Sequence, residues 1–170
     1  GALMPVGGAL GAGTLRLELG QWSVSPASFT PGAGVPVDID VTASDTVFDI
    51  ASKINGANAG VTATVLSDAS GERLLLRGKN TGEEAGFRLS VTDADGVDGD
   101  ANGLSRLVAG STVTQAAENA RATVNGIAVT SATNTFANTV SGVTFKAEAV
   151  TTAAVDITIA KDNSALTKNI

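Results

Sequence analysis

Residues 46–56 read TVFDIASKING and predict a short amphipathic helix. The apolar residues of this segment recur at the spacing of one helix face, and they are Val47, Ile50, Ala51 and Ile54. Thr46 and Asp49 occupy the two positions of a capping box, which fixes the start of the helix. Asn55 and Gly56 tolerate positive φ and mark its end, and Gly60 precedes the next element.

Strands are predicted on both sides of this helix, because apolar and polar residues alternate there with a period of two. The predicted strands cover residues 14–19, 37–41, 61–66, 73–77 and 87–91. Pro26, Pro31 and Pro36 indicate a loop between the first two strands. Residues 67–71 indicate a turn of about five residues that makes a hairpin of the third and fourth.

The second half of the chain repeats the hairpin pattern after a non-periodic stretch. Residues 93–103 are rich in Asp, Gly and Ala, so we expect a surface loop or a domain junction there, with a boundary between residues 93 and 114. Asn125 and Gly126 favour a two-residue primed turn. The strands predicted here cover residues 120–124, 127–130, 143–149 and 155–160.

These patterns predict a mainly β fold with one short helix, a β-rich α+β fold of two antiparallel β units, each sandwich-like or partly open and barrel-like. We expect one β-rich domain at residues 14–110, which contains the helix, and a second at 111–165. Residues 1–13 form a flexible glycine-rich lead or belong to the second unit. Hydrophobic residues make up 43% of the chain and aromatic residues only 4%, so aliphatic side chains must build the core.

Composition argues against several classes of partner. The net charge is −6 and the sequence pI is near 4.5, with basic residues scattered singly, so we expect no nucleic-acid binding. No apolar run approaches the roughly 20 residues of a membrane span, so we expect no membrane partner. The chain begins with Gly1 rather than Met, and we interpret it as a fragment of a longer protein.

Catalysis is not expected, and no catalytic, cofactor-binding or metal-binding residue is assigned. The chain has no His, Cys or Tyr, which removes the usual general bases, thiolate nucleophiles and most metal ligands. Asp38 and Asp40 could in principle form a glycosidase pair, but on a strand both point to the solvated face.

Residues 93–100 place four carboxylates in one loop, and carboxylate oxygens are the ligands that calcium prefers. In an EF-hand frame that starts at Asp93, the glycine position holds Asp98 and the closing glutamate position holds Leu104. The pattern therefore favours a solvated acidic loop.

Three other features have a simple structural interpretation beside a functional one. The glycines of residues 7–13 and the segment 78–81 lack the pattern of a phosphate-binding loop, so they indicate a linker and a turn. The apolar helix face could dock a partner, although covering its own sheet is the usual role of such a face. Trp22, expected in the proline-bounded loop, fits an interface anchor or simple packing, and interface residues stay open.

Several short motifs resemble known flagellar proteins. Residues 50–55 (IASKIN) and 60–65 (GVTATV) resemble the Ile-Asn motif of flagellin and the hook-associated proteins. Further matches resemble the filament-capping family, and they cover residues 11–15, 71–77, 81–82, 116–120, 123–127, 131–134 and 141–145. The last four form a second signature block that flagellin does not normally carry.

The chain therefore resembles the exposed middle portion of the bacterial filament-capping family, hook-associated protein 2. This resemblance implies β-rich head domains, with coiled-coil legs formed by terminal helices outside this chain. It implies an exported, extracellular, ring-like homo-oligomer at the filament tip, which promotes flagellin folding and insertion, prevents flagellin loss and needs no cofactor. The alternatives are an adhesin for host mucin or glycans, a flagellin variable domain and a hook–filament junction domain.

Overall fold

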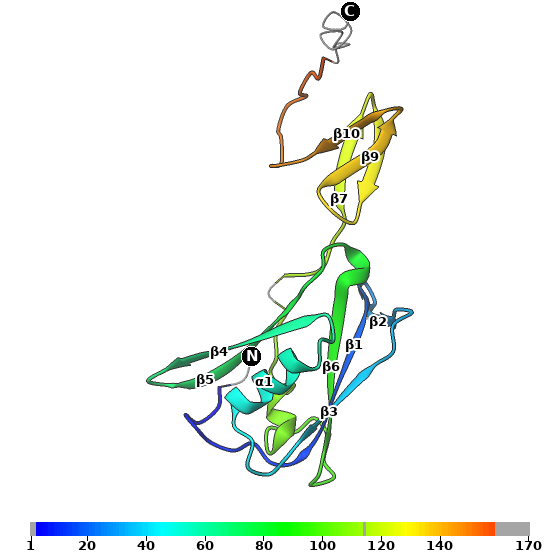
Figure 1. Cartoon of the computed structure of the whole chain (residues 1–170). Helices are drawn as coiled ribbons and strands as arrows, with labels where there is room; N and C mark the ends of the chain where they lie inside the picture. The colour runs from blue at the N-terminus through cyan, green and yellow to red at the C-terminus, as the bar shows by residue number, and fades with distance from the viewer. Residues whose placement is uncertain (1–2, 114, 159–170) are drawn as a thin grey trace, which may run out of the picture. The chain divides into compact units, whose positions relative to one another are not determined.

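The computed structural model describes residues 3–113 and 115–158. Antiparallel strand pairs dominate this part of the chain, with one α-helix, so the predicted mainly β fold with one short helix is confirmed (Figure 1). Contacts divide the chain into two units, Gly1–Thr133 and Asn134–Ile170. The predicted domain limits of 14–110 and 111–165 stay a prediction.

β1 (Gly13–Val24) is the central strand of the first unit. Its first half pairs antiparallel with β3 (Val37–Val41) along one edge and with β6 (Gly86–Asp93) along the other. Leu15 and Leu17 point to the same face and are 0% and 2% exposed, as the period-two pattern predicts.

The loop predicted around the three prolines is partly wrong, because residues 27–31 form β2 (Ala27–Pro31), which pairs with the second half of β1. Trp22 therefore lies on a strand, opposite Phe29. Pro31 ends β2 at the edge of the sheet, where a missing N–H costs little, so proline did not prevent a strand.

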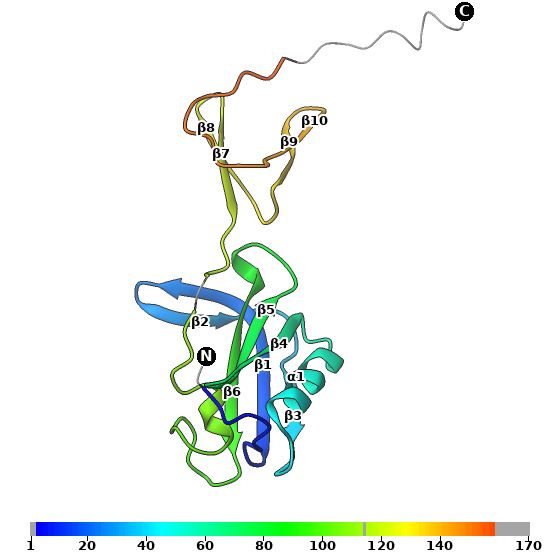
Figure 2. The ribbon, with the colours of Figure 1, turned by 90° about the vertical axis from the view of Figure 1, so that its left-hand side faces the viewer.

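α1 (Val47–Gly56) begins as predicted. The backbone N–H of Asp49 donates to Thr46 Oγ1 at 3.3 Å, and that of Thr46 donates to Asp49 Oδ2 at 2.9 Å. The predicted apolar face packs into the core with the inward residues of β1 and β3, which confirms its structural role, and Figure 2 shows α1 beside these strands. α1 ends at Gly56, as Asn55 and Gly56 indicated, although positive φ occurs further along the chain, at Asn58 and Gly60.

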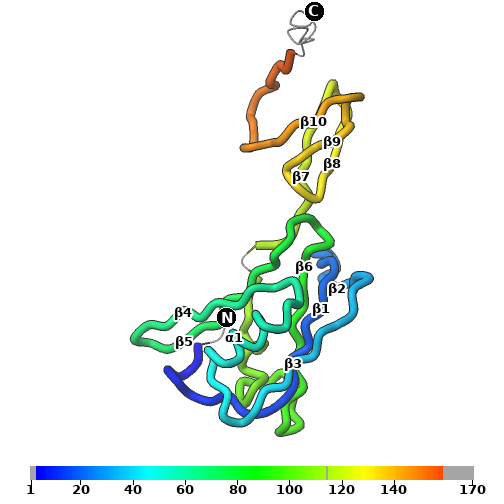
Figure 3. The backbone as a smooth tube through the Cα atoms, in the orientation of Figure 1, coloured from blue at the N-terminus to red at the C-terminus, as the bar shows by residue number. Residues whose placement is uncertain are grey.

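β4 (Val61–Asp68) and β5 (Gly71–Gly78) form the predicted hairpin, drawn in Figure 3 as an arm that extends from the sheet. The turn has two residues rather than five, because Asp68 and Gly71 are already strand partners. Asp68 Oδ1 accepts the backbone N–H of Ser70 at 2.7 Å and holds this tight turn.

The segment before β1 differs from the flexible lead that its glycines suggested. Met4 and Leu10 are 2% and 3% exposed within the core of the first unit. Met4 exchanges two backbone hydrogen bonds of 2.8 Å with Glu72, and Ala9 forms a bridge with Thr46. Two apolar side chains among the glycines are enough to fix the segment against the hairpin and the helix.

The rest of the first unit follows β6 through the predicted loop and η2 (Leu104–Leu107) to the hairpin of β7 (Ala120–Val124) and β8 (Ile127–Ser131). The two turn residues of this hairpin, Asn125 and Gly126, have φ of 51° and 82°. These values confirm the predicted Asn-Gly turn, which requires positive φ at both positions.

The second unit contains β9 (Thr135–Val140) and β10 (Val143–Lys146), whose Phe136 and Phe145 rings stack at 4.9 Å. β9 was not predicted, and β10 is shorter than the predicted 143–149. Residues 155–158 form no strand, so the prediction of 155–160 is wrong for these residues, and 159–160 lie outside the described part of the chain. Across residues 3–113 and 115–158, no helix is long and apolar enough to cross a membrane.

Candidate interaction surfaces

Asp38 and Asp40 lie on the exposed face of β3, as predicted. Arg16 Nε and Nη2 donate to the two carboxylate oxygens of Asp38 at 2.7 and 2.8 Å. These hydrogen bonds lower the pKa of Asp38 and keep it ionised. Asp38 therefore forms an exposed cross-strand ion pair with Arg16, and its lowered pKa does not suit the protonated acid that glycoside hydrolysis needs.

The acidic loop after β6 is built around Asp93, which is 6% exposed and so differs from the solvated carboxylate expected there. Burial acts to raise the pKa of Asp93, but hydrogen bonds, led by the backbone N–H of Ser105 at 2.9 Å, lower it overall. Asp98 Oδ1 in turn accepts the backbone N–H of Asp93 at 2.7 Å. These two acids hold the loop closed, and no cluster of three potential metal ligands occurs in residues 3–113 and 115–158.

A polar groove of about 510 Å³ lies between β1, η1 (Glu83–Ala85) and the base of the β7–β8 hairpin. Hydrogen bonds cross it: Thr81 Oγ1 donates to Ala132 O at 2.9 Å, and the Glu83 N–H donates to Asn119 Oδ1 at 3.0 Å. The predicted turn at residues 78–81 is a bend that follows the last residue of β5, Gly78, and Lys79 N donates to Gly60 O at 2.8 Å. The hydrogen bonds across the groove therefore hold the base of the β7–β8 hairpin to the rest of the first unit.

Trp22 is packed on one side and partly exposed on the other, so its role at an interface stays a prediction. Its Nε1 donates to Phe87 O at 2.8 Å, and its ring lies 5.1 Å from that of Phe29. Arg88 lies over the Phe29 ring at 4.8 Å and forms an ion pair with Glu18 at 2.6 Å. Trp22 is 44% exposed as a residue, while these contacts fix the orientation of its indole ring.

Asn55 has a role that the sequence reasoning missed. Its Nδ2 donates to Ala63 O at 2.9 Å, and its Oδ1 accepts the Ala63 N–H at 2.8 Å. The side-chain amide thus satisfies both backbone groups of one residue on the outer edge of β4, as a neighbouring strand would. The sequence signal for this role was an asparagine at the end of the helix, with a strand that begins six residues later.

Two family descriptions match separate parts of the chain. The Flagellin hook IN motif matches residues 28–80, which include α1 and the Asn55–Ala63 contact. The Flagellar hook-associated protein 2 C-terminus matches residues 117–170. The B-type flagellar hook-associated protein 2 of Pseudomonas aeruginosa is 30% identical over 183 residues, a match that covers 98% of this chain. The chain belongs to the flagellar hook-associated protein 2 family.

Solved members of the family have the same fold. The hook-associated protein 2 (FliD) of P. aeruginosa PAO1 matches 99% of this chain and 76% of its own, with a TM-score of 0.72 and 26% identity. The D1-D2-D3 domains of the flagellar cap protein FliD of Escherichia coli match 89% of this chain and 43% of theirs, with a TM-score of 0.68 and 26% identity.

The chain spans only part of its curated hook-associated protein 2 relatives. It covers 36% of the P. aeruginosa protein. A second relative, from E. coli K12, is 34% identical over 109 residues, which are 61% of this chain and 23% of that protein.

Proposed function

We propose that this chain is the head region of a protein that caps the distal tip of the bacterial flagellar filament. The observation that carries the proposal is the fold similarity to the P. aeruginosa hook-associated protein 2, which extends over 99% of this chain. The two family matches support it. They follow one another along the chain, and the second is named for flagellar hook-associated protein 2 rather than for flagellin.

In this role the protein is exported, lies outside the cell and acts by assembly rather than by catalysis. Its partners are further copies of itself, arranged as a ring-like cap, and flagellin, which it helps to fold and insert beneath the cap. Trp22 and the Arg88–Glu18 pair give the head a rigid recognition surface, because hydrogen bonds and ring contacts already fix their side chains.

The experiment is disruption of the full-length gene in the source bacterium, followed by measurement of unpolymerised flagellin in the medium and of filament length. We expect flagellin leakage with short or absent filaments, restored by the intact gene. A gene that lacks the region encoding residues 3–158 is expected not to restore the filaments. Normal filaments in the disrupted strain would contradict the proposal.

A further inference from the structure

The β4–β5 arm carries an exposed face that combines leucine and arginine. Strand alternation turns Leu74 and Leu76 toward the core and their neighbours in β5 the other way. The outward side chains form the basic–leucine face, which consists of Leu66, Arg73, Leu75 and Arg77. Leu66 and Leu75 are 53% and 43% exposed, on a hairpin whose inner side is already packed.

The positive charges at the base of this arm are poorly compensated within the unit. Arg73 approaches Asp68 at 3.4 Å, but both side chains are well exposed, and such a pair contributes little. Among residues 3–113 and 115–158, Arg77 and the nearby Lys79 have no carboxylate within ion-pair distance. The other acid of the arm, Glu72, is buried, so in a chain of net charge −6 this end of the arm is locally basic and suits an acidic partner.

The acidic loop has the complementary pattern. Val97 is 53% exposed and stands between Asp95 and Asp98, with Asp100 two residues further on. The closing hydrogen bonds around Asp93 hold this loop in one shape. Val97 with its flanking carboxylates is complementary to the two leucines of the arm with their flanking arginines. In one contact, the apolar side chains would pack together while the opposite charges pair around them.

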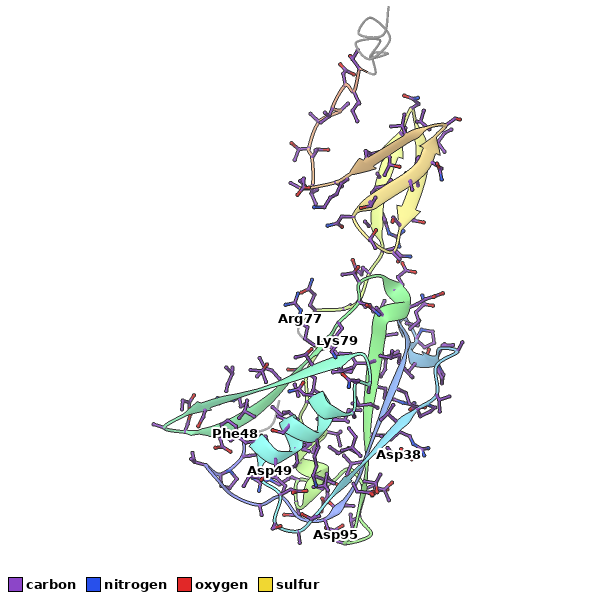
Figure 4. All side chains as sticks on the ribbon, viewed as in Figure 1. Asp38, Phe48, Asp49, Arg77, Lys79 and Asp95 are labelled. Carbon is purple, nitrogen blue, oxygen red and sulfur yellow. The ribbon has the colours of Figure 1, made fainter. Side chains whose placement is uncertain are left out.

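Arg77 and the acidic loop lie at opposite ends of β6, so these charges do not meet within one unit. A Cβ added to Gly78, at the end of β5, would lie 3.1 Å from Ala85 O, next to the first residue of β6. Asp95 follows the last residue, and eight strand residues span about 23 Å. Figure 4 shows Arg77 and Lys79 well apart from Asp95.

We propose that the basic–leucine face of one copy binds the acidic loop of a second copy, head to tail. This inference rests on the proposed assembly into a cap. When two copies join through two different surfaces, the pair still has one free basic–leucine face and one free acidic loop. Further copies can therefore add, which gives a closed ring or an open chain. The surfaces are small, so each contact is weak alone and ring closure strengthens it.

Cysteine cross-linking tests the contact directly, because the chain has no cysteine of its own. In the full-length protein, Leu75→Cys together with Val97→Cys is expected to give a ladder of disulfide-linked multimers on non-reducing gels. Mixing the two single variants is expected to give a covalent dimer that contains one of each. Failure of both would overturn the proposal.

Charge reversal provides the matched measurement. Arg77→Glu is expected to weaken self-association of the full-length protein about tenfold at low salt in sedimentation velocity, and adding Asp95→Lys is expected to restore it to within about threefold. Asp40→Lys makes the same charge change on β3 and is expected to leave association unchanged. No rescue would overturn the proposed contact, whereas failure of the cap proposal itself appears separately as normal filaments after gene disruption.

Discussion

Replacement of Asn55 by alanine tests whether the helix and the hairpin are joined by one side chain. The change removes both hydrogen bonds to the backbone of Ala63, which is 5% exposed. Asn55 itself is exposed, so water can partly replace the lost contacts. We therefore expect destabilisation rather than failure to fold.

The magnitude follows from two opposing contributions. Two hydrogen bonds contribute about 2 kcal/mol together, at roughly 1 kcal/mol each. Alanine in place of asparagine in the last helical turn returns about 0.5 kcal/mol of helix propensity. The free energy of unfolding should fall by about 1.5 kcal/mol, which lowers the urea midpoint by roughly 0.5–1 M.

Urea unfolding followed by far-UV circular dichroism and by the fluorescence of Trp22, the single tryptophan, measures this change. Ser52→Ala is the matched control, because it makes a similar propensity change on the exposed face of the same helix and removes no hydrogen bond found in the structure. If Asn55→Ala shifts the midpoint no more than Ser52→Ala, the amide does not join the two elements and the reasoning is refuted.

Two further predictions concern the groove and the acidic loop. Gly82→Ala should destabilise the first unit by about 1 kcal/mol more than Gly96→Ala in thermal unfolding: both have positive φ, 98° and 82°, but only at Gly82 would the new Cβ lie 2.8 Å from Ala132. Equal losses would show that the contact with Ala132 is unimportant. Because folding lowers the pKa of Asp93, its contribution is present above the ordinary aspartate pKa of about 3.9 and is lost as pH falls through the lower folded value. Asp93→Asn should therefore lose less stability than the parent between pH 5 and pH 2, and an unchanged acid dependence would contradict this.

The helix and the Asn-Gly turn could be predicted because short-range rules determine them. Thr46 and Asp49 cap a helix through groups three residues apart, and Asn125 and Gly126 need only their own backbone freedom. β2 was missed because the prolines were taken to indicate a loop, whereas β2 pairs with the end of β1 directly before it, in a hairpin that turns at Ser25 and Pro26. By contrast, the position of residues 3–12 depends on the hydrogen bonds between Met4 and Glu72, which lies far along the chain.

The candidate surfaces show the same limit. Asp38 and Asp40 could be placed on an exposed face from alternation alone, but the partner of Asp38, Arg16, lies on another strand. Trp22 could be named but not interpreted, since its hydrogen bond reaches Phe87, which is 65 residues away. Sequence periodicity assigns a side chain to a face, whereas its partners depend on the register between strands.

The Asn55–Ala63 contact joins the helix and the hairpin within the segment that matches the Flagellin hook IN motif. A two-stranded hairpin is marginal alone and needs a packed face and a protected edge. Ile54 supplies the first, since it is 0% exposed in the core that also contains Val61, and Asn55 supplies the second through the backbone of Ala63. Two adjacent residues thus supply both the packed face and the protected edge of the hairpin. The opposite face of the arm has neither of these roles and is open to a partner.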